Sequence, residues 1–248
     1  MSLWTKTRNA LVLSVRSVFR DATRFDFHGR EVVVPRSIPN DVKFAVLRGK
    51  YEAAEVTVVR RYLNPGDCVI ELGGSLGLVS AVVRSCIGPD ALHLVVEANP
   101  AVLDTLARNA GLSDRTVVIG GIIAPDEGSP TAQFYADNNT LAGSAFRDDG
   151  PHAAAAVERI TIRDVIDTFG IDEFTIVCDI EGAELDVVRE LEDNGGFGCS
   201  TIIAEVHPDI LARRGVGIDA FLDLVAKVGF EPIDRIGDVH VWRRAPAV

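Results

Sequence analysis

The chain has 248 residues, of which 47% are hydrophobic, and carries a formal net charge of −11. A chain of this length and composition can bury a substantial core, and single α/β domains of this size are common. The excess of acidic residues disfavours a broad contact with the phosphate backbone of nucleic acid. We therefore expect a small or weakly charged ligand and no nucleic-acid partner.

Cysteine usage and hydropathy suit a soluble protein in a reducing compartment. The four cysteines contain no C-x-x-C pair and are expected to be reduced and mostly buried. No run approaches the roughly 18 to 20 apolar residues of a spanning helix. The amphipathic start (residues 1–24) is expected to pack on the domain or on a partner subunit rather than on a membrane. We expect a cytoplasmic protein, for which an oligomer is compatible with the sequence.

Apolar runs alternate with helical patterns along most of the chain. Strands are predicted over 68–72, 92–97, 116–119, 174–179 and 201–206, and helices over 75–86, 100–111, 161–169, 183–193 and 218–228. This alternation predicts an α/β, Rossmann-like fold, with a mainly parallel sheet and helices on both faces. Two short β-like runs around Gly237-Asp238 predict a C-terminal antiparallel β-hairpin.

Two segments fall outside this alternation. Residues 1–50 form a predicted N-terminal helical or β extension, and residues 51–248 form the main domain. Within it, about 121–158 is rich in Gly, Pro, Asp and Asn, which predicts an inserted loop or hairpin. Loops at the carboxyl ends of parallel strands cover the ligand crevice, so the insertion is either a substrate lid or a surface loop without a binding role.

The segment VIELGGSLG ends a predicted strand and begins a helix, a context in which glycines let a ligand approach the backbone closely. Counting from Gly73, Ser75 and Leu78 occupy later glycine positions of the NAD fingerprint, which is therefore not met. Glu71 would repel a pyrophosphate and attract the ammonium group of a methionine moiety. Glu97, at the end of the next strand, suits hydrogen bonds from both ribose hydroxyls. Charge thus favours S-adenosylmethionine (SAM) over NAD.

The predicted cofactor contacts lie at the ends of four strands and in the turns that follow them. They are Glu71, Gly73, Gly74, Ser75, Gly77, Glu97, Ala98, Asn99, Gly120, Gly121 and Asp179. The alternative is that the glycines merely make tight turns and that the two glutamates are solvated charges.

With these residues placed, the chain resembles the FkbM family of methyltransferases across roughly 51–206. The resemblance rests on Tyr51-Glu52 with Glu55, PGDCVIELGGSLGLVS, VVEANP with Asn109 downstream, CDIEGAELDVV and AEVHP. It implies a class I methyltransferase fold and O-methylation, commonly of sugar or polyketide hydroxyls. The chain departs from the family's usual Asp and Ala-Asn pair at Glu71 and Gly74-Ser75, and from a usual proline at Ala98.

Methyl transfer to a hydroxyl requires the acceptor oxygen in line with the methyl group and a group that removes its proton. Asp179, Glu181 and His207 follow two strands that are expected to be neighbours. In one mechanism His207, with an ordinary pKa of about 6.5, is the general base, while Asp179 or Glu181 orients it or the substrate. In the other, Asp179, Glu205 and His207 hold a divalent ion such as Mg²⁺. The metal-free mechanism is favoured, since histidine is a less typical ligand of Mg²⁺.

Other acidic residues and histidines are less informative. Tyr51, Glu52 and Glu55 have helical spacing, and either fold over the cofactor or belong to a surface helix. Glu184 is expected to cap a helix or complement its dipole. The remaining histidines receive no role; they are His28, His93, His152 and His240.

The sequence thus favours a SAM-dependent O-methyltransferase acting on a hydroxyl of a small molecule, such as a sugar, a glycan precursor or a polyketide-like product. The alternatives are a catalytically inactive SAM-binding partner subunit, a protein-modifying methyltransferase and an NAD-dependent oxidoreductase.

Overall fold

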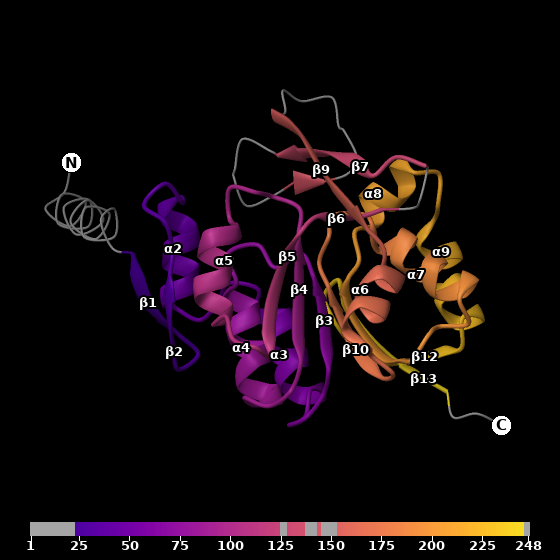
Figure 1. Ribbon diagram of the computed structural model, residues 1–248, viewed down its shortest axis with the longest axis horizontal. Helices are drawn as coiled ribbons and strands as arrows, with labels where there is room; N and C mark the ends of the chain where they lie inside the picture. Colours follow the sequence, from indigo (N-terminus) through magenta and orange to yellow (C-terminus); the bar gives the residue numbers. More distant parts are fainter. Residues whose placement is uncertain (1–22, 125–127, 137–142, 145–152, 246–248) are drawn as a thin grey trace, which may run out of the picture.

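The computed structural model describes residues 23–124, 128–136, 143–144 and 153–245, and its centre is a seven-stranded sheet (Figure 1). The strand order is β12-β13-β11-β10-β3-β4-β5. Neighbouring strands from β11 to β5 are parallel, which confirms the predicted mainly parallel sheet. These five strands are β3 (Val69–Leu72), β4 (His93–Glu97), β5 (Thr116–Gly120), β10 (Phe174–Cys178) and β11 (Cys199–Glu205).

The C-terminal hairpin is confirmed as well. It consists of β12 (Phe230–Ile236) and β13 (Val239–Arg244), which pair antiparallel across a turn with Gly237 at φ +63°. β13 also pairs antiparallel with β11, so it lies between β11 and β12. The hairpin therefore closes one edge of the parallel sheet.

Helices cover both faces of the sheet, because alternate strand residues point to opposite sides and each side buries its own apolar cluster (Figure 1). On one face lie α3 (Ala53–Tyr62), α4 (Leu78–Ile87) and α5 (Leu103–Ala110). On the other lie α6 (Ile162–Phe169), α7 (Glu184–Asp193), α8 (Pro208–Arg213) and α9 (Ile218–Lys227). The short α8 is not predicted from the sequence. α4 begins three residues later than predicted, since Gly77 has a left-handed conformation.

The N-terminal extension packs on the main domain. It contains the hairpin of β1 (Arg24–Phe27) and β2 (Arg30–Val33), followed by α2 (Asn40–Leu47). Its apolar residues belong to the same buried cluster as α3 and α4. Asn109 of α5 joins the two parts, since its amide group bonds both the N–H and the carbonyl of Val33 at 2.7 and 2.8 Å.

Residues 1–22, nearly all of the amphipathic start, lie outside the described residues. None of the helices in the described ranges is long and apolar enough to cross a membrane. All four cysteines are free, with Cys178 and Cys199 buried.

The insertion forms a second, smaller sheet above the carboxyl ends of the main strands (Figure 1). Its strand order is β6-β9-β7-β8, where β6 is Ile122–Ile123, β7 is Thr131–Ala136, β8 is Gly143–Ser144 and β9 is Ala153–Ile160. β7 pairs antiparallel with both β8 and β9, so the predicted loop or hairpin is part of a four-stranded sheet. The rest of the insertion lies outside the described residues.

Candidate active site

A cavity of about 270 Å³ lies where the strand order reverses, at the carboxyl ends of β3 and β10. To one side of β3 lie β4 and β5, and to the other lie β10 and β11, so this is the switch point at which open α/β sheets bind ligands. The apolar part of the lining, which we call the apolar wall, includes Val96, Val102, Ile122, Ile123 and Phe134. The polar lining includes Tyr51, Glu52, Ser75, Glu97, Asn99, Asp179 and Glu181.

The glycine-rich turn forms the base of this cavity through close packing. A Cβ atom on Gly73 would lie 1.9 Å from the carbonyl oxygen of Asp179, so the ends of β3 and β10 approach each other as no other residue would allow. A Cβ atom on Gly74 would lie 2.5 Å from the Val95 side chain. Gly73 and Ser75 line the cavity, whereas Gly74 and Gly77 pack against α5 and support the turn from behind. The predicted turn is therefore present, with one of its glycines lining the cavity and two packing against α5.

Three residues of the cavity lining have strained backbones. Glu52, Ser75 and Glu181 have φ values of +43°, +47° and +51°, and they make up three of the five non-glycine residues with positive φ in the described part of the chain. This conformation costs roughly 1–3 kcal/mol for a residue with a Cβ atom and concentrates at functional sites. Backbone strain of this kind is therefore concentrated at the cavity.

Glu97 is fixed at the edge of the cavity by two backbone donors. Its Oε2 accepts a hydrogen bond from the N–H of Ser75 at 2.7 Å, and its Oε1 accepts one from the N–H of Asn99 at 2.6 Å. Burial raises the pKa of the Glu97 carboxyl, while these backbone hydrogen bonds oppose the rise. Each oxygen of a carboxylate can accept more than one hydrogen bond, so Glu97 remains suited to the two hydroxyls of a ribose.

Glu71 does not face the cavity, and the interpretation that its charge attracts the ligand is wrong. The side chain is 2% exposed; its Oε1 accepts a hydrogen bond from Ser80 of α4 at 2.6 Å, and its Oε2 lies 2.7 Å from Nε2 of His93. Strand alternation explains this, because Ile70 and Leu72 point to the opposite face. His93, which received no role from the sequence, is the partner of Glu71.

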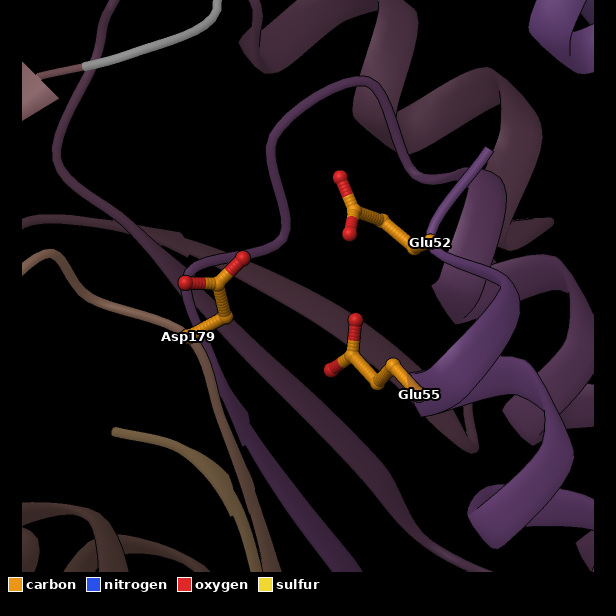
Figure 2. Close-up of side chains that lie close together, drawn as sticks. All are labelled: Glu52, Glu55 and Asp179. Atoms are coloured by element: carbon orange, nitrogen blue, oxygen red, sulfur yellow. The ribbon is translucent and has the colours of Figure 1, made fainter. Parts of the chain in front are cut away.

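The negative charge beside the cavity comes instead from α3 and the end of β10. One carboxylate oxygen from each of Glu52, Glu55 and Asp179 lies within 4.8 Å of the others, and Figure 2 shows the three side chains pointing toward one another. Burial, followed by repulsion from nearby carboxylates, raises the pKa of all three carboxyls. We call these three residues the acidic trio. Of the two alternatives for Tyr51, Glu52 and Glu55, the structure supports the one in which this segment faces the cofactor cavity, since Tyr51 and Glu52 line it.

A second cluster lies at the ends of β10 and β11 and contains the predicted catalytic residues. Nε2 of His207 lies 3.7 Å from Oδ1 of Asp179 and 3.6 Å from Oε2 of Glu181, so the structure brings the three residues together. Nδ1 of His207 lies 2.8 Å from Oε1 of Glu184, a buried residue that also accepts a hydrogen bond from the N–H of Gly182 at 3.1 Å. Glu184 thus orients His207, a role that the sequence did not reveal.

The surroundings of His207 change its predicted chemistry. Burial alone would lower its pKa, but the hydrogen bond and charge of Glu184, together with Asp179 and Glu181, raise the pKa of His207 to about 9. The assumption of an ordinary pKa is therefore wrong, and His207 is an imidazolium in the free protein at neutral pH. Asp179 and Glu181 line the cavity, whereas His207 is not among its lining residues.

The metal ligands proposed from the sequence are not assembled. Among the described residues, the group with ligand atoms within 4.8 Å of one another is the acidic trio, which shares Asp179 with the predicted set but contains neither Glu205 nor His207. α3 approaches Asp179 more closely than the sequence indicated, and Nδ1 of His207 is already bonded to Glu184. Asp179, Glu205 and His207 therefore do not form a group of this kind in the described part of the chain.

The remaining predicted contacts divide between the cavity and its surroundings. Ala98, Asn99 and Gly121 line the cavity, while Gly120 is exposed and is not among its lining residues. The apolar wall formed by β6 and by Phe134 of β7 was not identified from the sequence. Phe134 shows that the insertion takes part in the site, as the lid alternative requires.

The fold and site together define the class of protein. A parallel sheet with this order, closed by an antiparallel hairpin, carries a glycine turn, a carboxylate at the end of β4 and a switch-point cavity; this is a Rossmann-like, SAM-dependent methyltransferase. The family model described as "Methyltransferase FkbM domain" matches residues 77–232. The chain belongs to the FkbM methyltransferase family.

Structural comparison returns several methyltransferases at low identity. Fibrillarin of Aeropyrum pernix, with natively bound SAM, matches at 12% identity and a TM-score of 0.44, over 75% of this chain and 71% of that one. Precorrin-6y C5,15-methyltransferase of Geobacter metallireducens matches at 13% and 0.44, over 79% and 89%. Magnesium protoporphyrin IX methyltransferase of Synechocystis, with bound SAH, matches at 10% and 0.40, over 77% and 80%. Likeness at this level carries no argument about function. A search of curated proteins finds no match.

Proposed function

We propose that this methyltransferase acts on a hydroxyl oxygen of a small molecule, such as a sugar, a glycan precursor or a polyketide-like product. The observation that carries the proposal is the pair of carboxylates, Asp179 and Glu181, that lines the cavity beside His207. A hydroxyl must lose its proton when it is methylated, and a positioned carboxylate is a suitable acceptor.

The lining fits the parts of the cofactor. Glu97 is held where it can accept hydrogen bonds from the ribose hydroxyls, and the apolar wall from Val96 to Phe134 suits the adenine ring. Gly73 lets the chain approach the ligand closely. When bound, SAM supplies an electrophilic methyl group on a cationic sulfur.

Glu181 is the best placed general base. Its carboxylate lines the cavity and is more exposed than that of Asp179, with 37% of its side chain accessible against 27%. Its strained backbone, at φ +51°, aims it from the turn that precedes α7. The His207 imidazolium beside it orients the Glu181 carboxylate, and Glu184 in turn orients the imidazole ring. This assigns the proton transfer to a carboxylate and makes His207 a positioning residue.

A transfer assay tests the proposal. The protein is incubated with methyl-labelled SAM and a panel of hydroxyl-bearing sugars and polyketide-like alcohols, and the products are examined by mass spectrometry and NMR for a methyl ether. A methyl ether whose formation is lost in Glu181→Gln supports the proposal. Methylation of nitrogen, carbon or protein side chains alone would contradict it. SAM binding without any transfer would favour the inactive partner subunit, and binding of NADH in place of SAM would favour the oxidoreductase.

A further inference from the structure

We propose that the acidic trio, Glu52, Glu55 and Asp179, binds the ammonium group of the amino-acid part of SAM. The inference rests on the proposed use of SAM by this site and assigns a cationic subsite to residues at one end of the cavity. Glu52 and Asp179 line the cavity, and Glu55 lies one turn further along α3, on the side that faces Asp179 (Figure 2).

Glu55 has a buried carboxylate without a hydrogen-bond donor among the described residues, which favours a cationic ligand. Glu55 is 5% exposed, and its carboxylate has no hydrogen bond or ion pair with a described residue. Oδ1 of Asp179 is also buried and accepts no hydrogen bond within the described part of the chain. Buried carboxylates without donors are costly, and proteins ordinarily pair them. The ammonium group of a ligand would supply the missing donors.

The spacing of the trio suits a primary ammonium group. Such a group has three N–H donors in a tetrahedral arrangement, and charge-assisted bonds of about 2.8 Å place three acceptor oxygens about 4.6 Å apart. The three carboxylates supply one oxygen each within 4.8 Å of the others. Each donor of the ammonium group would therefore find one acceptor.

The charges around the trio also favour a cation. Glu71, Glu181 and Glu205 add negative charge to one or more members of the trio, and His207 opposes it at Glu52 and Asp179. One imidazolium does not balance these carboxylates. An ammonium group would lower the cost of ionising them and would displace the protons that they hold in the free protein, so binding should release protons.

Binding of three ligands to matched variants tests the assignment by calorimetry. The ligands are SAM, S-adenosylhomocysteine and 5′-methylthioadenosine, of which the third keeps the adenosine but has no ammonium group. Glu55→Gln is expected to lower the affinity for SAM and for S-adenosylhomocysteine by about tenfold to a hundredfold, because a charge-assisted bond is lost. The affinity for 5′-methylthioadenosine should change by less than about twofold. Glu231→Gln, the same chemical change at an exposed residue of β12, should leave all three unchanged. Wild-type protein should also release protons on binding SAM, as measured in buffers of different ionisation enthalpy.

The outcomes separate the inference from the function on which it rests. If wild-type protein binds none of the three ligands, the proposed function fails. If Glu55→Gln weakens methylthioadenosine as much as SAM, the trio is not the ammonium subsite. If Mg²⁺ or Ca²⁺ without cofactor raises the Tm of wild-type protein but not of Glu55→Gln, the trio is a metal site and the inference is overturned. Should Glu55→Gln fail to fold by circular dichroism, the same comparison is made with Glu52→Gln, at the less buried end of the trio.

Discussion

Glu71 and His93 form a buried pair beneath the glycine-rich turn, with Oε2 of Glu71 2.7 Å from Nε2 of His93. The pair joins β3 to β4, and Ser80 adds a hydrogen bond from α4. It therefore fixes the strand that ends in the turn from within the core, and it takes Glu71 away from the ligand.

Removal of one partner should destabilise the protein strongly. His93→Ala leaves the Glu71 carboxylate buried with Ser80 as its remaining side-chain donor, and leaving a buried group short of a hydrogen-bond partner costs about 1–3 kcal/mol, or more for a charged group. Urea denaturation followed by circular dichroism measures the change. The double variant Glu71→Leu with His93→Leu should recover part of the loss, because no unpaired charge remains. A loss below about 1 kcal/mol in His93→Ala would show that the pair does not stabilise the fold.

The sheet and its helices could be predicted because the spacing of apolar residues and the presence of turn residues are properties of short segments of sequence. The sequence could not place Glu71. Whether a carboxylate at the end of a strand faces a ligand or a helix depends on what lies across the sheet, and β4 places His93 opposite Val69, on the face that Glu71 also shares. The pairing register is a property of two strands, and no single segment reveals it.

Alanine substitution at Gly73 tests the packing of the glycine-rich turn, and the same substitution at Gly66 is the matched control. Gly73 and Gly66 both have left-handed backbones, at φ +89° and +96°, but a Cβ atom on Gly66 meets nothing within 4 Å, whereas on Gly73 it meets the Asp179 carbonyl at 1.9 Å. Gly66→Ala should lower the free energy of unfolding by about 1–2 kcal/mol, the cost of the backbone conformation alone. Gly73→Ala should lower it further and weaken SAM binding, as measured by denaturation and calorimetry. Equal effects of the two variants would show that β3 and β10 do not pack as described.

The acidic trio should make the free protein less stable as pH rises. Because the folded-state pKa of Glu55 is raised, the folded state holds a proton that the unfolded state has lost. The associated stability is fully present below the ordinary pKa of 4.5 and is lost as pH rises through the raised value. Glu55→Gln should therefore increase the Tm near pH 8 and have a smaller effect near pH 5. Each kcal/mol gained in the free energy of unfolding should raise the Tm by about 2–4 °C. A lower Tm at pH 8 by calorimetry would contradict this account.

The candidate site was predicted in part, for a similar physical reason. Asp179, Glu181 and His207 come together because the carboxyl ends of parallel strands share one edge of the sheet, which the sequence could indicate. Glu55 and Glu184 act through contacts with distant segments, and their spacing alone fits an ordinary helix. Phe134 belongs to a small sheet whose weak alternation gave no register.

Substitutions in the catalytic cluster should separate turnover from cofactor binding. Glu181→Gln removes the proposed base and should lower kcat by about 10²–10⁴, with the Kd for SAM nearly unchanged. His207→Ala should also lower kcat, since Glu181 loses the imidazolium that orients it. Single-turnover kinetics and calorimetry on the same preparations measure the two quantities. Near-normal turnover in Glu181→Gln would remove this residue from proton transfer, and a weakened SAM complex would place it in the cofactor site.

The pH dependence of turnover distinguishes a carboxylate base from a histidine base. The pKa of His207 is raised to about 9, so the imidazolium is present across neutral pH and is lost as pH rises through about 9. If it orients Glu181, the rate of methyl transfer should be nearly constant between pH 7 and 8 and fall as pH rises through about 9. Glu184→Gln keeps a hydrogen-bonding side chain but removes the charge that raises the pKa, so this fall should move to lower pH. A rate that instead increases up to about pH 9 would mean that neutral His207 is the base, because the rate would then follow its deprotonated fraction.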